Sequence, residues 1–385
     1  MLQNCRNWRE DSRMRILWDF TFASNGGALA SLEDFIAFVR DNHDLKHEHV
    51  VLTSIPVRAD ELTKNTKMLH IPCRNPLMRL VNFIFGLQRI VKEENIDYVI
   101  YPGGLPNPFV AKPFAFFVRQ ALYFCEALKQ MPLKSRVGFG LRKEILKFVA
   151  KRADVIFVQT DFMKERVQSF FRPSGQVVKI VWSVINDALI PNVRNRRKCE
   201  DERLKFLYVS LPNGRPYKNH LNLLRGLRLA LDMGLDAEMI LTCPRIGESR
   251  DKVVLTIHRE IEKLMLDNNV ILTGKLSREA TLALYDKADI FVFPSICESF
   301  GVPLLEAMAY GMPILASNLD VFREVTNEAC LFFDSYNPND IAKVLVNSLA
   351  VREELSRKSK EVYRSLYSGK TIWEAVYDSI SQVNK

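Results

Sequence analysis

Short runs of β-branched and aromatic residues alternate with amphipathic segments along the chain, and this alternation constrains the fold more than any other feature. In the first half, the strand-like runs begin at Met14, Val50, Tyr98, Val155 and Val178. Helix-like segments occupy residues 31–40, 77–94 and 142–151. Strands that alternate with helices pair in parallel, because each helix carries the chain back to the starting edge of the sheet. The sequence therefore predicts an α/β protein built on parallel sheets.

A polar, charged stretch over residues 190–203 interrupts the alternation and is typical of an exposed linker between domains. The alternation then restarts with runs that begin at Phe206, Glu238, Val270, Ile290, Pro313 and Cys330. Further helices are expected at 221–233, 277–287, 303–310 and 338–349. We therefore predict a polar extension over 1–13, a first domain over 14–189 and a second domain over 204–369. Ligands of open parallel sheets bind beyond the carboxyl ends of the strands, so the functional residues should follow strands.

The excess positive charge of the chain lies entirely in its first half. Of the 385 residues, 54 are Lys or Arg and 45 are Asp or Glu, which gives a net charge of +9. Residues 1–200 hold 31 basic and 20 acidic residues (+11), which leaves 23 and 25 (−2) for residues 201–385. Residues 101–200 alone carry 18 basic against 7 acidic side chains. Such a balance suits nucleic acid, an anionic membrane or a phosphorylated substrate, and the total charge does not choose among them.

The remaining composition points to a cytoplasmic protein. Seven scattered cysteines without a CxxC pair favour reduced thiols. The N-terminal residues are too polar for a signal peptide, and no uncharged apolar run approaches the roughly 18 residues of a membrane span. No metal-ligand cluster appears, since His43, His47 and His49 lie in a charged loop typical of a surface. Any membrane contact is therefore expected to be peripheral, and no metal site is expected.

The segment 290–317 carries the strongest functional pattern. It predicts a buried strand, a turn with Glu298, a helix that starts at Pro303 and a second strand beyond Gly311. Backbone amides point out of a helix N-terminus, where the helix dipole favours an anion such as a pyrophosphate. The residues that would supply these amides are Phe300, Gly301 and Val302.

Two carboxylates, Glu298 and Glu306, flank this predicted anion site, and two interpretations are open. A carboxylate beside a phosphate is repulsive unless it accepts hydrogen bonds from hydroxyls, which suggests that each glutamate binds a sugar ring. Alternatively, Glu298 caps the helix and Glu306 favours its first turns.

Two other loops follow predicted strands. The turn after Phe206 places Arg215 and Lys218 where cations would meet the charge of a departing diphosphate, although solvated loop charges are the simpler alternative. Gly26 and Gly27 follow the first strand, where glycines either allow a backbone to approach a ligand closely or form a plain turn.

Taken as a whole, the segment 290–317 resembles the E-x7-E signature of glycosyltransferase family 4, a large family of retaining enzymes with the GT-B fold. Glu298 is the first glutamate, Phe300-Gly301 follow it, and Glu306 is the second. The resemblance runs from Met14 to the C-terminus and is strongest over 206–334. It implies two Rossmann-like domains that face an interdomain cleft, with a C-terminal helix over 370–385 that joins the first domain.

The resemblance also implies roles for individual residues. Glu298 would contact hydroxyls of the donor hexose, Glu306 would hold the ribose, and Lys218 would bind the diphosphate. The arginine that usually accompanies this lysine has no clean counterpart, and Arg215 is the nearest substitute. Further donor contacts are implied at Gly26, Gly27, Ser299, Phe300, Gly301 and Val302, with the base near Gly274 and Lys275. Where relatives often have His-Asn near the acceptor, this chain has Arg119 and Gln120.

The expected reaction is the transfer of a hexose from a nucleotide diphosphate sugar to an acceptor hydroxyl, with retention and without a metal or other cofactor. By resemblance, the pathway is bacterial surface polysaccharide or lipopolysaccharide synthesis, with a saccharide or lipid-linked saccharide acceptor at an anionic membrane surface on the inner face of the cell membrane. Two alternatives stay open. A basic nucleic-acid-binding protein is disfavoured because the charge is not clustered with aromatics. An inactive GT-B partner subunit is disfavoured because Glu298, Glu306 and Lys218 are intact.

Overall fold

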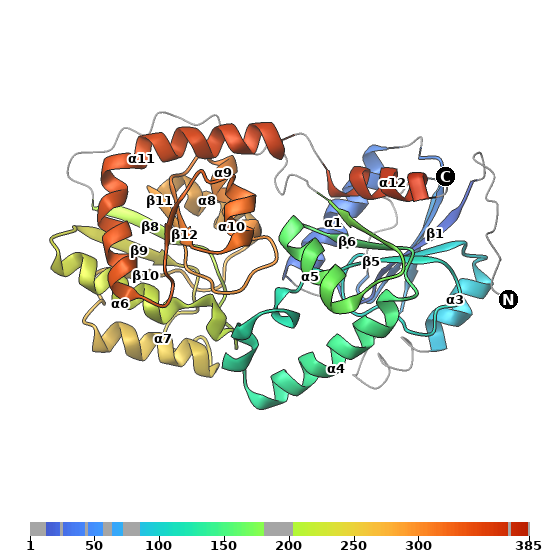
Figure 1. Ribbon diagram of the computed structural model, residues 1–385, viewed down its shortest axis with the longest axis horizontal. Helices are drawn as coiled ribbons and strands as arrows, with labels where there is room; N and C mark the ends of the chain where they lie inside the picture. Colours follow the sequence, from blue (N-terminus) through green and yellow to red (C-terminus); the bar gives the residue numbers. More distant parts are fainter. Residues whose placement is uncertain are drawn as a thin grey trace. The chain divides into compact units, whose positions relative to one another are not determined.

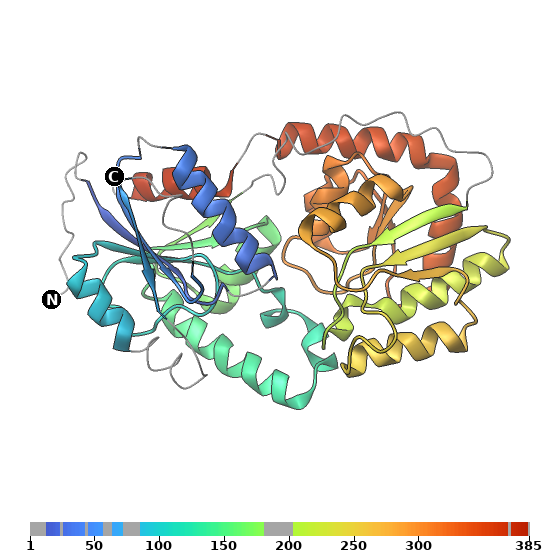
Figure 2. The same cartoon turned by 180° about the vertical axis from the view of Figure 1, so that it is seen from behind.

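The computed structural model describes residues 13–23, 26–42, 45–56, 64–71, 85–180, 203–368 and 371–383. The chain divides into two compact units, each built on one sheet (Figure 1, Figure 2). The first unit comprises Met1–Arg119, Phe139–Ile180 and Thr371–Lys385, and the second comprises Gln120–Gly138 and Val181–Lys370. The extension expected over 1–13 and the linker expected over 190–203 lie outside the described residues, apart from Arg13 and Arg203.

The first unit contains a seven-stranded sheet in the order β3-β2-β1-β4-β5-β6-β7, and every pairing is parallel. Its strands are β1 (Arg15–Phe20), β2 (Glu48–Thr53), β3 (Thr66–His70), β4 (Tyr98–Tyr101), β5 (Phe114–Phe117), β6 (Val155–Val158) and β7 (Gln176–Lys179). Its helices are α1 (Gly26–Asp41), α3 (Leu87–Glu93), α5 (Asp161–Phe171) and α12 (Ile372–Val383), and α4 (Leu133–Ala150) enters it from the second unit. The five expected strands are confirmed, whereas β3 and β5 were not predicted.

Aromatic side chains hold α12 in the core of the first unit. The Trp373 ring packs edge-on against Phe35 of α1, with ring centroids 5.0 Å apart, and against Trp18 of β1 at 5.7 Å. Trp18 and Trp373 are both buried. Burial of aromatic rings of this size is a large part of the hydrophobic free energy that attaches a terminal helix.

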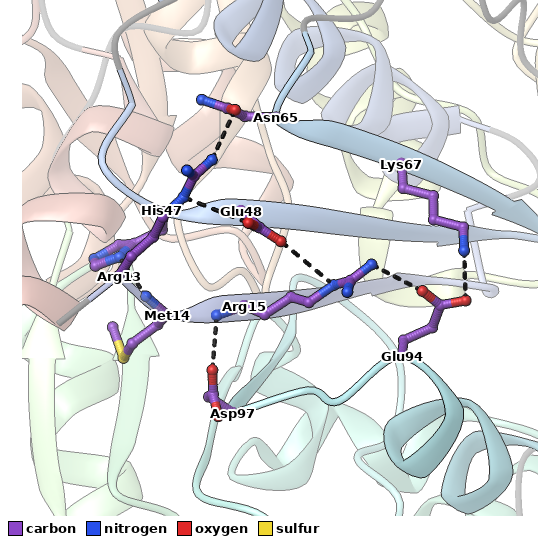
Figure 3. Close-up of polar contacts among 9 residues, drawn as sticks. All are labelled: Arg13, Met14, Arg15, His47, Glu48, Asn65, Lys67, Glu94 and Asp97. Atoms are coloured by element: carbon purple, nitrogen blue, oxygen red, sulfur yellow. Dashed lines mark hydrogen bonds and ion pairs between the residues drawn. The ribbon is translucent and has the colours of Figure 1, made fainter.

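Ion pairs join the amino ends of neighbouring strands in the first sheet (Figure 3). Arg15, at the start of β1, donates to Glu94 at 2.9 Å and lies 3.7 Å from Glu48 of β2. Lys67 of β3 reaches the other oxygen of Glu94 at 2.6 Å, and the backbone amide of Arg15 donates to Asp97. These contacts pair part of the positive charge of the first half at the amino edge of the sheet, away from the carboxyl edge where ligands of such sheets bind.

The second unit contains a six-stranded parallel sheet in the order β10-β9-β8-β11-β12-β13. Its strands are β8 (Leu204–Tyr208), β9 (Ala237–Leu241), β10 (Val270–Leu272), β11 (Ile290–Phe293), β12 (Ile314–Ser317) and β13 (Leu331–Phe333). Its α-helices are α6 (His220–Asp232), α7 (Lys252–Lys263), α8 (Arg278–Lys287), α9 (Val302–Ala309), α10 (Asp320–Thr326) and α11 (Pro338–Leu366). All six strands match expected runs. The order reverses between β8 and β11, which makes that position the switch point of a doubly wound sheet.

The helices differ from the sequence expectations in several places. Three helices, α5, α7 and α10, were not predicted from the sequence. α1 begins at Gly26, upstream of the expected start at 31, and α11 extends to Leu366, beyond the expected end at 349. α4 begins at Leu133, upstream of the expected start at 142. Among the described residues, no helix combines the length and the apolar character that crossing a bilayer requires.

Candidate active site

Lys218 and Glu298 meet at the switch point of the second sheet. β8 and β11 are hydrogen-bonded neighbours there. Lys218 ends the short 3₁₀ helix η6 (Pro216–Lys218) in the loop after β8, and Glu298 lies in the loop after β11. Lys218 Nζ donates to Glu298 Oε1 at 2.5 Å, and the two side chains are only 14% and 15% exposed. Strand order thus brings together two residues that are eighty positions apart in sequence.

Hydrogen bonds fix the loop that carries Lys218. The Tyr208 hydroxyl donates to the Lys218 carbonyl at 2.7 Å. Asn219 follows in a left-handed conformation (φ 61°), and its side-chain amide donates to the carbonyls of Pro294 at 3.1 Å and Ser335 at 2.8 Å. The loop after β8 is therefore attached to the loop after β11, which holds Lys218 and Glu298 in register.

His220 adds a neutral side chain beside this lysine. It is buried at the start of α6, and its ring lies 4.8 Å from the ring of Tyr208. Burial, together with the nearby charge of Lys218, lowers the pKa of His220 to about 3. The imidazole is therefore uncharged at neutral pH and does not compete with Lys218 for an anion.

The N-terminus of α9 begins next to Glu298. Gly301 precedes the helix with φ 95° and provides no side-chain cap. A Cβ at this position would come within 3.1 Å of the Phe293 ring, so both the conformation and the packing require glycine. The first amides of an α-helix have no partner within the helix, and the helix dipole makes this end attractive to anions. Val302 is the first residue of the helix and is exposed. The sequence predicted a start at Pro303, so the helix begins one residue earlier than expected.

This geometry decides whether Glu298 caps the helix, which the sequence left open. The helix cap is Gly301, without a side-chain hydrogen bond, so Glu298 does not cap α9. Its carboxylate accepts a hydrogen bond from Lys218 instead.

Glu306 is buried and doubly bound. Its carboxyl side chain is 2% exposed, and Oε1 forms an ion pair with Arg278 of α8. The Tyr285 hydroxyl, also from α8, donates to Oε2 at 2.6 Å. Burial and the neighbouring carboxylate raise the pKa of Tyr285 well above its usual value, so it remains a donor. A buried carboxylate is costly unless it is paired, and these two partners account for its presence.

Arg278 and Tyr285 were not identified from the sequence. They are seven residues apart, which is about two turns, so both lie on one face of α8. The sequence could have shown that Arg278 and Tyr285 share one face of a helix, because they are seven residues apart. The sequence could not have shown that both bind Glu306.

The other predicted donor residues of the second unit lie around these groups. Arg215 is exposed at the start of η6, and its carbonyl accepts from the amide of Lys218 at 3.1 Å. Gly274 follows β10 with φ 77°, and its amide donates to the Cys243 carbonyl at 3.0 Å. Lys275 beside it is exposed, Ser299 is partly exposed and Phe300 is buried.

The remaining predicted residues lie at the carboxyl edge of the first sheet or next to it. Gly26 and Gly27 form the start of α1, downstream of β1. Arg119 donates to Ser31 Oγ at 3.2 Å, and burial lowers its pKa to about 10. Gln120 caps a 3₁₀ helix, since its side-chain oxygen accepts from the amide of Leu122 at 3.1 Å. The contact of these four residues with a substrate stays a prediction. Within the described ranges, no group of three His, Cys, Asp or Glu side chains is arranged to hold a metal ion.

Two α/β units with parallel sheets define the GT-B class of fold. Solved structures of this class resemble the chain along nearly its whole length. Sucrose-phosphate synthase from Thermosynechococcus elongatus superposes with a TM-score of 0.72 at 16% sequence identity, covering 96% of this chain and 98% of that one. The expected fold class is therefore confirmed.

Sequence comparisons identify the second unit more specifically. Residues 194–364 match the family model of glycosyl transferases group 1. O-antigen chain mannosyltransferase B of Escherichia coli is 37% identical over 233 residues, which are 58% of each chain. O-antigen biosynthesis glycosyltransferase WclY of Escherichia coli is 32% identical over 95 residues, 24% of this chain and 27% of that one. The chain thus spans between about a quarter and three fifths of the length of these curated relatives.

Proposed function

We propose that the protein is a retaining glycosyltransferase that moves a hexose from a nucleotide diphosphate sugar to an acceptor hydroxyl. The observation that carries the proposal is the Lys218–Glu298 pair beside the N-terminus of α9, at the switch point of the second sheet. All of these residues lie within the range that matches the glycosyl transferases group 1 model. Because two relatives are named for O-antigen synthesis and one of these is a mannosyltransferase, we propose a surface polysaccharide pathway and mannose as the first hexose to test.

The chemical problem in such a transfer is the charge of the leaving group. Breaking the bond between the hexose and the β-phosphate leaves an additional negative charge on the nucleoside diphosphate. A cation about 4 Å away stabilises a unit charge by roughly 4 kcal/mol at an effective dielectric near 20. Lys218 and the N-terminus of α9 supply this stabilisation, and exposed Arg215 serves as a second cation. Because the chain supplies these positive groups itself, we propose that no metal or other cofactor is required.

The two carboxylates bind sugar hydroxyls in this proposal. When the diphosphate engages Lys218, Glu298 is released to accept hydrogen bonds from the hexose. Glu306 binds the ribose while it keeps its bonds to Arg278 and Tyr285, because a carboxylate has about four acceptor positions and these partners occupy two. Backbone groups near Gly274 and Lys275 contact the base.

The first unit, together with Gln120 at the start of the second, is assigned to the acceptor and to part of the donor. We propose that Gly26 and Gly27 approach the donor phosphates, and that Arg119 and Gln120 lie near the acceptor. The acceptor is a saccharide or a lipid-linked saccharide, and the enzyme works in the cytoplasm at the inner face of the cell membrane. The net charge of the first half, +11, suits that anionic surface better than it suits nucleic acid.

Thermal stabilisation of the full chain by nucleoside diphosphates tests this function. The melting temperature is measured with UDP, GDP, ADP and an oligonucleotide, in the presence of EDTA. We expect at least one diphosphate to raise it and the oligonucleotide to leave it unchanged. Glu306→Gln should reduce the shift, whereas the exposed Glu262→Gln on α7 should not. Stabilisation by the oligonucleotide alone would identify a nucleic-acid-binding protein, and no response to any of these ligands would identify an inactive relative.

A further inference from the structure

The outer face of α4 carries large apolar side chains that the fold leaves exposed. Its members are Leu133, Val137, Leu141 and Phe148, with exposed fractions of 71%, 66%, 65% and 55%; we call them the α4 stripe. The first three are four residues apart, which places them in one row along the helix. The opposite face packs into the protein through Leu146, Val149 and Ala150, all buried. Because all four members belong to a single helix, labelled α4 in Figure 1, their alignment follows from helix geometry alone.

Basic side chains border the stripe along both sides. Residues 133–152 contain seven Lys or Arg and one Glu, a net charge of +6. At 100° per residue, Arg136 and Lys147 fall along one side of the stripe, and Lys134 falls along the other. All three are exposed. The single acid, Glu144, lies within the stripe, where Lys147 Nζ is 4.0 Å from its carboxylate.

A fifth exposed apolar side chain, Phe109, is held next to the C-terminal end of the stripe. Arg152, just beyond α4, donates to the carbonyls of Pro108 and Val110, the latter at 2.9 Å. The loop between these carbonyls presents Phe109, which is 61% exposed. The Arg152 guanidinium also lies 5.9 Å from the ring of Phe148. Phe109 therefore extends the exposed apolar surface, and Arg152 adds a cation near the Phe148 ring.

The binding partner of this surface must cover an exposed apolar row and must also bind the cations beside it. A nucleic acid would use the cations and would stack a base on Phe148, but it would gain nothing from the aliphatic row of Leu133, Val137 and Leu141. A second copy of this chain would cover the apolar row, but two copies of α4 facing each other would bring together two helices that each carry a net charge of +4. An anionic bilayer satisfies both features, because the apolar row enters the boundary of the acyl chains while the cations bind lipid phosphates.

We propose that the α4 stripe, with Phe109, docks the protein on an anionic lipid bilayer. The inference rests on the proposed function in one respect: docking would bring the enzyme to a lipid-linked acceptor. Vesicle binding itself is independent of the donor site.

The test is sedimentation of the full chain with vesicles of phosphatidylcholine and phosphatidylglycerol, and with vesicles of phosphatidylcholine alone. The wild type should bind the anionic vesicles, bind the neutral ones weakly and dissociate as the salt concentration rises. Val137→Asp/Leu141→Asp should lower the partition coefficient at least tenfold. Arg136→Gln/Lys147→Gln should lower it by roughly 30-fold, since each cation near an anionic surface contributes about a factor of five.

Matched controls use exposed residues of the second unit. The apolar control is Met265→Asp, because Met265 follows α7 and is 78% exposed. The charge control is Arg259→Gln/Lys263→Gln on α7, which removes the same charge as the basic variant. Both controls should bind within twofold of the wild type.

Three outcomes would overturn the proposal: full binding by the Asp variant, equal binding of the wild type to neutral vesicles, or a dimer in sedimentation velocity that the Asp variant abolishes. Nucleoside diphosphates should stabilise the Asp variant as they do the wild type. A protein that binds vesicles but responds to no diphosphate would therefore refute the proposed function and leave the docking surface intact.

Discussion

Replacing Glu298 by Gln should tighten the binding of a nucleoside diphosphate while it slows hexose transfer. In the structure the carboxylate lies 2.5 Å from Lys218 Nζ, so a phosphate must share or take over the cation that Glu298 holds. A phosphate oxygen bound to the same ammonium would lie about 5 Å from the carboxylate, and two unit charges at that distance repel by about 3 kcal/mol at an effective dielectric near 20. Water that enters the open site reduces this repulsion, which leaves about 1–3 kcal/mol, or a gain in affinity of roughly 5- to 150-fold.

Isothermal titration calorimetry with the nucleoside diphosphate measures this gain, and the release of diphosphate from the nucleotide sugar measures turnover. Glu298→Gln keeps the shape of the side chain and removes only its charge, whereas the exposed Glu262→Gln removes the same charge elsewhere in the unit. The reasoning is refuted if Glu298→Gln weakens diphosphate binding, or if it leaves both affinity and turnover as they are in the wild type.

Three further variants test other parts of the site. Gly301→Ala should lower the free energy of unfolding by about 1–3 kcal/mol, because φ is 95° and the new Cβ would lie 3.1 Å from the Phe293 ring; an unchanged urea midpoint contradicts this. Tyr285→Phe leaves one oxygen of buried Glu306 without its donor, at a cost of about 1–3 kcal/mol, and should raise KM for the nucleotide sugar more than it lowers kcat; equal effects on both would contradict a positioning role. His220 has a pKa of about 3 when folded, below the ordinary 6.5, so its contribution to stability is complete above pH 6.5 and is lost as the pH falls from about 6.5 toward 3, by up to about 1.4 kcal/mol per pH unit. His220→Gln should flatten that part of the profile in urea titrations, and parallel profiles would show that this histidine is not responsible.

The strands that the sequence predicted share a clear local signal. β11 and β12 are runs of buried apolar residues bounded by turn residues, so their position follows from composition alone. β3 lacks this signal, because Thr66–His70 forms a partly exposed edge strand with two charged or polar residues at its start. β5, Phe114–Phe117, is as buried and as short as β11, so the same local signal was present there and was not used.

Two helices were missed in whole or in part because of individual residues at or near their ends. In α4, Gly138 and Gly140 lower the helix propensity, yet the helix runs through both from Leu133. For α7, the signal was present, since Asp251 accepts hydrogen bonds from the amides of Val253 and Val254 as an N-cap. Sequence reasoning did not use it.

Some residues of the candidate site could likewise be predicted from the sequence, and others could not. Glu298, Glu306 and Lys218 follow strands in a recognisable spacing, and the structure brings Glu298 and Lys218 into contact as the strand order requires. Arg278 could not be assigned to Glu306 from the sequence, because that ion pair depends on how α8 packs beside α9. The relation of Gly26 and Gly27 to the donor likewise depends on tertiary arrangement and stays a prediction.

The measurement that tests the central claim most directly is hexose transfer itself. The purified chain is incubated in EDTA with UDP-, GDP- and ADP-hexoses and a lipid-linked saccharide, and both diphosphate release and the anomeric proton of the product are followed by NMR. We predict release from one donor class, coupled to a product with the anomeric configuration of that donor. A folded protein that transfers from none of these donors, or that yields the inverted anomer, would contradict the account.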